Sequence, residues 1–209
     1  MSKLTDKKKE VMETMMKDAV FEATCQVIRE RGWPGLTMER VAEQAGVSKG
    51  TVYNYFKDKK ELVWLVMTRL GLRIESRIRE IMEKEKSSSE ALKEIIRIEL
   101  LNRSENAHMG TAFAQAISSE PEIRKRFQSD DHPFNKVRIL LRNLFEEGMK
   151  KGEFRQTDSL FMEMILTSIF NGISRSWAFD MLQKTPEELS ELTISLFEDR
   201  FILGKGACR

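Results

Sequence analysis

The sequence predicts an all-α fold, and three observations lead to that prediction. Its 209 residues include only four prolines, and the stretches between them are rich in Glu, Lys, Leu, Met, Arg and Ala, which favour helices. Apolar residues recur at the spacing of an amphipathic helix. No stretch shows the apolar–polar alternation of a half-buried strand. We therefore expect an N-terminal three-helix domain, a linking helix and a C-terminal helical domain.

A long first helix is expected over about 7–31. Its apolar positions recur every four residues and would form one buried stripe: Val11, Met15, Ala19, Ala23 and Val27. Gly32 ends this helix because glycine adopts the left-handed conformation that a helix C-terminus favours. The following Trp-Pro-Gly then makes a turn.

Two short helices are expected next, over about 38–45 and 49–56. Thr37 and Ser48 stand directly before them, and their side chains can accept hydrogen bonds from free N–H groups of a helix's first turn. Two short helices joined by a tight, glycine-containing turn form the helix-turn-helix pattern, which here covers 37–56.

The rest of the chain is also expected to be helical. A linking helix begins near Lys59, reaches about Lys84 and is followed by a run of three serines. Further helices are expected near 89–105, 108–118, 121–128, 134–151, 157–183 and 186–203. We assign residues 1–60 to the first domain and 61–209 to the second.

Charge and composition exclude several classes of protein. The net charge is only +2, with 12 basic and 9 acidic residues in the first sixty, so any nucleic-acid contact must use a local patch. The two cysteines, Cys25 and Cys208, and the two histidines, His108 and His132, form no metal-ligand cluster. No nucleophile elbow, ordered triad or phosphate-binding loop is present. We expect no metal, no cofactor and no enzymatic activity.

The sequence also lacks the marks of export. The lysine-rich N-terminus is not followed by an apolar stretch, as a secretory signal would require. No apolar run approaches the length of about 20 residues that a membrane span needs. We therefore expect a cytoplasmic protein that does not enter the membrane.

The outer face of the second short helix fits double-stranded DNA. With Val52 and Phe56 pointing inward, the residues pointing outward or lying at the edges are polar, aromatic or basic: Lys49, Gly50, Thr51, Tyr53, Asn54, Tyr55 and Lys57. Asn pairs with adenine and Thr contacts base edges. Lys and Tyr bind phosphates, and glycine in the first turn allows a phosphate to approach closely.

The stretch Gly35–Leu62 resembles the DNA-binding domain of TetR-family transcriptional regulators. The resemblance rests on the Thr cap, the Val-Ala…Ala-Gly-Val-Ser turn, the Gly-Thr-Val-Tyr helix start and the Phe-Lys-Asp-Lys exit. It covers about 12–70, and residues 85–209 carry no such motif. At position 55 the family often has His, and Tyr55 keeps a hydrogen-bond donor there.

This resemblance implies a role for each matching position. Thr37 and Lys59 would contact phosphates, Tyr53 and Tyr55 would grip the backbone, and the start of the second short helix would lie at the groove edge. The predicted DNA-binding residues are Thr37, Ser48, Lys49, Gly50, Thr51, Tyr53, Asn54, Tyr55 and Lys59.

The last two helices predict a dimer. The helix over 157–183 is apolar round too much of its circumference to be buried on one side only. We hypothesise that these helices pair with their symmetry mates in a four-helix bundle, as the resemblance also implies. A monomer with a thick core is the alternative. The predicted interface residues are Ile169, Ile173, Trp177, Leu189, Leu192 and Leu196.

The middle helices are rich in Met and Phe, and Met adapts to irregular cavities. Any one of these residues is more often simple core. Together with the family resemblance, however, they predict an apolar pocket for a small-molecule effector. The predicted pocket residues are Met67, Met109, Phe113, Phe145, Met149, Phe161 and Ile165.

The resulting hypothesis is a homodimeric repressor that an apolar small molecule releases from a pseudo-palindromic operator. Effector binding would shift the linking helix and change the distance between the two helix-turn-helix domains of the dimer. A DNA-binding architectural or interaction protein without a ligand switch is the first alternative, and an enzyme hidden in the second domain is another. The N-terminal lysines Lys3, Lys7, Lys8 and Lys9 form either a minor-groove arm or a solvated tail, and we favour the tail.

Overall fold

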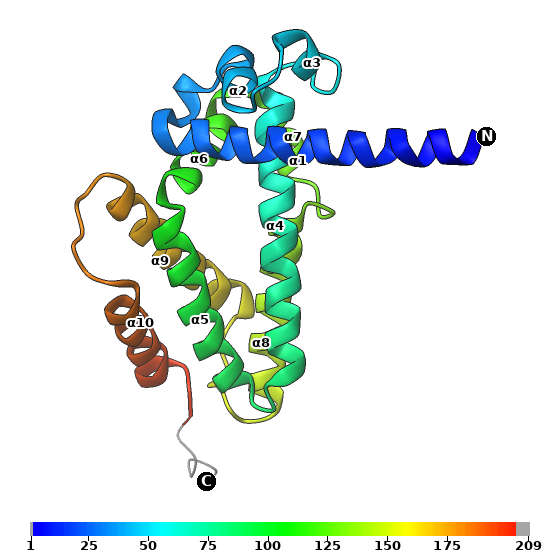
Figure 1. The fold of residues 1–209 in the computed structure, drawn as a ribbon. Coiled ribbons are helices and arrows are strands. Elements are labelled where there is room, and N and C mark those ends of the chain that lie inside the picture. Colours follow the sequence, from blue (N-terminus) through cyan, green and yellow to red (C-terminus); the bar gives the residue numbers. More distant parts are fainter. Residues whose placement is uncertain (1, 204–209) are drawn as a thin grey trace. The chain divides into compact units, whose positions relative to one another are not determined.

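The computed structural model describes the backbone of residues 2–203 and the side chains of residues 7–203. The side chain of Lys3 and all of Cys208, both considered above, lie outside the described residues. The described chain is helical apart from turns and one isolated bridge between Phe154 and Ile202, which confirms the all-α prediction (Figure 1). The helices are α1 (Ser2–Gly35), α2 (Met38–Gln44), α3 (Lys49–Tyr53), α4 (Lys59–Lys84), α5 (Ser88–Glu105), α6 (Ala107–Ser119), α7 (Pro121–Phe127), α8 (Pro133–Lys150), α9 (Ser159–Ala178) and α10 (Pro186–Arg200). None of the helices within 2–203 is both long and apolar enough for a membrane span.

The chain forms two compact units, and they divide it differently from the predicted domains. Unit 1 takes the chain up to Arg69 together with Ala112–Lys125, and unit 2 takes Leu70–Thr111 and the chain from Arg126 on. The first turns of α4 belong to unit 1 because their apolar side chains, Leu62, Val63 and Val66, are fully buried. Both α4 and α6 run from one unit into the other.

Helix α1 has the predicted break but begins earlier than expected. Gly32 has φ 63° and ψ −171°, a backbone conformation that interrupts the helix before a last turn through Pro34. Of the predicted apolar stripe, only Ala23 and Val27 are buried. The prediction was wrong for Val11 and Met15, which are 50% and 66% exposed, because α1 extends beyond the body of unit 1 (Figure 1). Ala19 is exposed as well.

Two other helices end earlier than predicted. Helix α3 ends at Tyr53, and Phe56 is buried in the turn that follows it rather than in the helix. Helix α9 ends at Ala178, and shortly afterwards Asp180 adopts a φ of 53°. Phe179 and Met181 therefore lie in a connection and are exposed.

The core of unit 2 joins α5, α8, α9 and α10. Phe145 lies at its centre, with ring centroids 5.8 Å from Phe154 and 6.3 Å from Phe197. Around it pack apolar side chains from all four helices, such as Leu92 and Leu166. Cores of this kind dominate the stability of a helical unit, since each fully buried Leu or Phe contributes about 1.5–3 kcal/mol.

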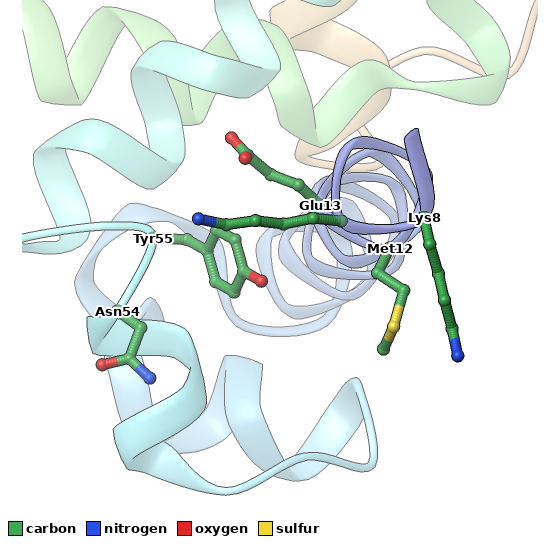
Figure 2. Close-up of a pocket in the computed structure, with 6 residues that line it drawn as sticks. Lys8, Met12, Glu13, Asn54 and Tyr55 are labelled. Atoms are coloured by element: carbon green, nitrogen blue, oxygen red, sulfur yellow. The ribbon is translucent and has the colours of Figure 1, made fainter. Parts of the chain in front are cut away.

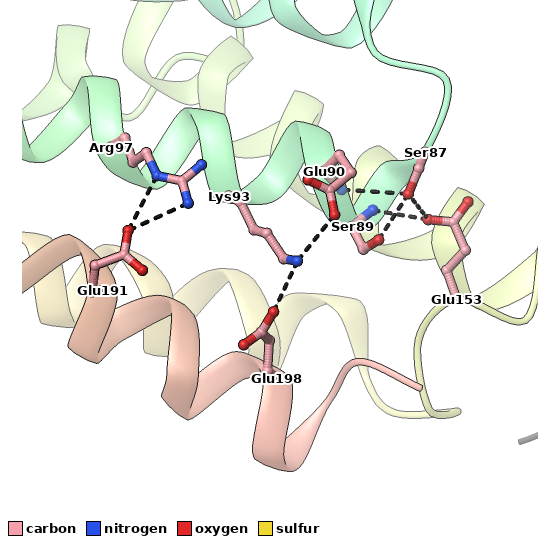
Figure 3. A network of polar contacts seen from close by, with 8 residues as sticks. All are labelled: Ser87, Ser89, Glu90, Lys93, Arg97, Glu153, Glu191 and Glu198. Atoms are coloured by element: carbon pink, nitrogen blue, oxygen red, sulfur yellow. Dashed lines mark hydrogen bonds and ion pairs between the residues drawn. The ribbon is translucent and has the colours of Figure 1, made fainter. Parts of the chain in front are cut away.

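Polar contacts hold α10 along α5. Lys93 of α5 contacts Glu198 of α10 at 2.8 Å, and Arg97 contacts Glu191 at 3.3 Å (Figure 3). The hydrogen bond to Glu198 raises the pKa of Lys93. At the start of α5, the carboxylate of Glu153 accepts hydrogen bonds from the Ser87 hydroxyl and the Ser89 N–H, both at 2.8 Å. These contacts fix the ends of α5 and α10 relative to the turn after α8.

One carboxylate is buried deep in unit 2. Glu163 of α9 is fully buried, and its two oxygens accept hydrogen bonds from Nε and Nη2 of Arg138 at 2.9 and 3.2 Å. Arg142, one turn further along α8, lies 3.9 Å from the same carboxylate. A buried charge needs such partners because its desolvation is costly, so this cluster fixes the register of α8 against α9.

His132 is the N-cap of α8 and is 3% exposed. Its Nδ1 accepts a hydrogen bond from the Phe134 N–H at 3.3 Å, and its ring lies 5.0 Å from that of Phe127 and 5.6 Å from that of Phe134. Burial lowers the pKa of His132 to about 4, because the charged imidazolium would lose its hydration.

We predict that His132 makes unit 2 less stable in acid. Between its usual pKa of about 6.5 and the folded value of about 4, the unfolded state binds more protons, so stability falls as the pH drops through this window. The slope from this one group is at most about 1.4 kcal/mol per pH unit. His132→Asn keeps a capping side chain without this titration and should flatten the slope, measured by urea unfolding at several pH values. His108→Asn, at an exposed position, is the control, and equal slopes in both variants would contradict the prediction.

Candidate nucleic-acid interface

Two side-chain caps build the helix-turn-helix, as predicted. Thr37 Oγ1 accepts a hydrogen bond from the Arg40 N–H at 3.3 Å, and Ser48 Oγ accepts one from the Thr51 N–H at 3.0 Å. The hydroxyls of Ser48 and Thr51 also lie 2.8 Å apart. Between the two helices Gly46 has φ 67°, which suits glycine at this tight turn. The caps therefore fix where each short helix begins.

Burial decides which face of α3 points outward. Val52 is fully buried and Phe56 is 7% exposed, while Gly50, Tyr53 and Asn54 are exposed. The predicted inward and outward faces are thus confirmed. A five-residue helix is unstable by itself, so this anchoring is what holds α3 in place.

Lys49 has an acidic partner that the sequence analysis missed. Its ammonium forms an ion pair with Glu39 of α2, and both side chains are more than half exposed. The hydrogen bond to Glu39 raises the pKa of Lys49. The Lys49 nitrogen also lies 5.6 Å from the ring centroid of Tyr53. A phosphate must therefore compete with Glu39 for this lysine.

Lys59 is positioned by an aromatic ring. Its nitrogen lies 4.2 Å from the ring centroid of Trp33, which is 5% exposed. The Trp33 Nε1–H in turn donates a hydrogen bond to the Ser119 hydroxyl at 3.2 Å. Trp33 was read from the sequence only as part of a turn, and nothing local indicates its partner 86 residues away.

The start of α4 carries a second set of ion pairs. Asp58 Oδ1 accepts hydrogen bonds from the N–H groups of Lys60 and Glu61 at 2.9 and 3.1 Å, so it caps the helix. The Lys60 ammonium lies 2.6 Å from Glu122 of α7, and this hydrogen bond raises the pKa of Lys60. The segment 112–125 thus contacts Trp33 and Lys60, which flank the two short helices of unit 1.

The model of the tetR family of bacterial regulatory proteins matches residues 20–64, which span these short helices and their caps. This segment of the chain is a TetR-family helix-turn-helix domain. Relatives of the whole chain include the fatty acid metabolism regulator protein of Bacillus subtilis, which is 26% identical over 86% of this chain and 90% of that protein. An uncharacterised regulator of the same organism, YhgD, is 25% identical over 77% of this chain and 83% of its own length.

Solved structures share the fold beyond the matched segment. The fatty acid degradation regulator FadR of Bacillus halodurans superposes with a TM-score of 0.78 at 22% identity, covering 93% of this chain and 97% of that one. FadR of Bacillus subtilis, solved in complex with stearoyl-CoA, gives a TM-score of 0.75 at 19% identity over 85% and 95% of the two chains. All four of these proteins are regulators, which agrees with the expectation that this chain is not an enzyme.

The residues predicted to line one effector pocket are distributed over both units. Met67 and Phe113 are buried in unit 1, whereas Met109, Phe145, Met149 and Ile165 belong to unit 2. Phe161 is 54% exposed, because α9 turns the neighbouring Met162 and Leu166 inward instead. Two hollows on the described part of unit 1 contain none of these residues.

The predicted dimer residues divide into two groups. Leu192 and Leu196 of α10 are 56% and 44% exposed. Leu189 instead lies in the core of unit 2, and Ile169, Ile173 and Trp177 are partly buried against that core. Further exposed apolar residues that the prediction did not assign to the interface lie on α9: Leu160, Phe161 and Met164.

We predict that Glu39→Gln strengthens DNA binding. The substitution removes one negative charge beside the outer face of α3 and frees the Lys49 ammonium for a phosphate. One additional phosphate contact should steepen the dependence of log affinity on log salt by about 0.9. Fluorescence anisotropy with a duplex at several salt concentrations measures this slope. Glu43→Gln, exposed on the same helix, is the control, and an equal change in both variants would argue against the Lys49 pairing as the cause.

Proposed function

We propose that this chain is a homodimeric repressor that binds a pseudo-palindromic operator and leaves it when a small apolar molecule binds. The observation that carries the proposal is the outer face of α3, which is capped by Ser48, anchored by Val52 and exposed at Gly50, Tyr53 and Asn54. Helices of this kind enter the major groove with their first residues toward the base edges. As a regulator of bacterial genes, the protein would act in the cytoplasm.

Seven of the nine predicted residues have a proposed task on DNA. Thr51 and Asn54 read base edges, since amide and hydroxyl groups pair with exposed donors and acceptors of the major groove. Tyr53, Tyr55 and Lys59 bind backbone phosphates and set the register. The Thr37 and Ser48 oxygens accept hydrogen bonds from the helix starts. Their hydroxyl hydrogens would turn to phosphates from Glu39 and from Thr51 when DNA binds.

The proposed dimer uses the apolar side chains that one chain leaves uncovered. Leu160, Phe161 and Met164 on α9 and Leu192 and Leu196 on α10 are between 43% and 56% exposed. A second copy related by a two-fold axis would cover both helices with the same residues of its own. Two copies would also present two α3 helices to successive major grooves, at a spacing of about 34–36 Å.

A long-chain acyl thioester is the effector to test first. One reason is the similarity over most of the chain to the Bacillus subtilis fatty acid metabolism regulator. The other is the fold shared with FadR of Bacillus subtilis, which was solved in complex with stearoyl-CoA. Such a ligand would act by preferring the conformation of the dimer that does not fit the operator. Helices α4 and α6 run through both units, and α6 ends at Ser119, the partner of Trp33. A shift of α6 would therefore move Trp33 through its hydrogen bond to Ser119, and Trp33 would in turn move Lys59, which lies over its ring.

An architectural DNA-binding protein without a ligand switch is the competing function. It would bind duplexes through the same phosphate-binding residues but with little preference for sequence. Selection from random duplexes with the purified chain decides between the two. Enrichment of one inverted repeat supports the regulator, and an unenriched pool contradicts it. Adding stearoyl-CoA to the selected complex then tests the switch, and unchanged affinity would exclude this effector.

We predict different consequences for phosphate and base contacts. Lys59→Ala should weaken binding to every duplex and reduce the salt slope by about 1. Asn54→Ala should instead reduce the preference for the selected site, by about 1–3 kcal/mol per half-site if Asn54 contacts a base bidentately. Binding of both variants to the selected and a scrambled duplex measures the difference. Identical losses on both duplexes would contradict this division of roles.

We predict that a charge on the exposed side of α10 breaks the dimer. Leu196→Glu places a carboxylate where the partner's apolar side chains would pack, and an unpaired buried charge is strongly unfavourable. Sedimentation at micromolar concentration should show dimers for the unmodified chain and monomers for the variant. Leu72→Glu, at a comparably exposed position on α4, should remain dimeric. A monomeric unmodified chain would refute the proposed assembly.

A further inference from the structure

We propose that the N-terminal arm, defined as residues 2–18 of α1, is a second DNA-binding element. Its Lys8 and Lys9 would hold a backbone phosphate beside the one contacted from the end of α3. The inference depends on the DNA-binding role given above and extends it to a segment for which the sequence analysis favoured a solvated tail. The observation behind it is an open groove between this arm and the end of α3.

The groove has a volume of about 600 Å³ and is lined by residues of two segments of unit 1. One side is Asn54 and Tyr55, which directly follow α3. The other side is a single face of the arm, since positions 8, 9, 12 and 13 fall together on a helix with 3.6 residues per turn. In Figure 2, Asn54 and Tyr55 lie to the left of α1, Met12 extends downward from the helix, and Lys8 extends downward on the right of the helix. The proposed site is therefore continuous with the candidate nucleic-acid interface.

The chemistry of the groove fits a sugar–phosphate backbone. Two ammonium groups and the Tyr55 phenol offer hydrogen-bond donors to phosphate oxygens, while Asn54 keeps the base-reading role proposed above. Met12 is 61% exposed and offers an apolar surface to a deoxyribose. The one acid in the lining, Glu13, accepts a hydrogen bond from Lys17 at 2.5 Å, which lowers the pKa of Glu13. The charge of Lys9 lowers this pKa further, so a phosphate would compete with Glu13 for Lys9. In Figure 2 the Glu13 carboxylate points away from Asn54.

The exposure of the arm argues that something binds to it. Val11, Met12 and Met15 are between 50% and 66% exposed, on a part of α1 that extends beyond the body of unit 1. An isolated helix of this length is only marginally stable in water, so a bound duplex would also stabilise it. Charge favours DNA over an apolar protein partner, because two lysines, Lys8 and Lys9, line the groove.

The test compares lysines on opposite faces of the arm. Lys8 and Lys9 line the groove, whereas Lys7 lies on the far side of the helix and does not line it. Lys8→Ala and Lys9→Ala should each reduce the salt slope of operator binding by about 0.9, and Lys7→Ala should leave it unchanged. Met12→Glu places an acid in the groove and should weaken binding at least tenfold, while Val11→Glu, also exposed, is its matched control. Circular dichroism checks that each variant is folded.

The variant Asn54→Ala reports on DNA reading by the end of α3, whereas the lysine variants report on the arm. Comparing them shows which of the two proposals fails. Suppose that Asn54→Ala loses selectivity while Lys8→Ala and Lys9→Ala behave like Lys7→Ala. The proposal for the arm is then wrong, and the proposed role of α3 is still supported. If Asn54→Ala and Lys59→Ala have no effect on DNA binding either, the proposed function itself is contradicted, and with it the proposal for the arm. Met12→Glu and Val11→Glu could instead weaken operator binding equally, with no change in salt slope for the lysine variants. This result would mean that the arm contacts protein, and it would also overturn the proposal.

Discussion

The burial of Val52 and Phe56 is the constraint on which the DNA-binding surface depends. Helix α3 has only five residues, too few to persist without tertiary support. Val52 anchors the helix and Phe56 anchors the turn after it, each contributing about 1.5–3 kcal/mol when fully buried. The same anchoring turns Gly50, Tyr53 and Asn54 outward. Stability and DNA reading are therefore set by opposite faces of one short segment.

Three basic residues of the candidate interface already have partners within the protein itself. Lys49 is paired with Glu39, Lys60 with Glu122, and Lys59 lies over Trp33. Ion pairs between exposed side chains contribute little to stability, so a phosphate can replace the acidic partner at small cost. These contacts nevertheless hold the long side chains in defined positions. The interface is thus ordered in advance, and its acids lower the affinity for any arbitrary polyanion.

Unit 1 is not a continuous stretch of chain, and this has a functional consequence. Residues 112–125 join it from the middle of the sequence, with Ser119 bonded to Trp33 and Glu122 paired with Lys60. The segment continues through α6 into residues of unit 2. The position of Lys59 is therefore linked to the C-terminal part of the chain by α6 as well as by α4, the only link that the sequence analysis had considered.

The sequence by itself determined the features that depend on neighbouring residues. Both caps, the break at Gly32 and the order of the helices were predictable, because hydrogen bonds and backbone conformations act within one helical turn. Tertiary structure alone decided the pairing of Glu39 with Lys49, the burial of Leu189 and the exposure of Val11. An apolar stripe shows that a helix has a face to bury, but only the packing of distant segments decides how much of that face is covered.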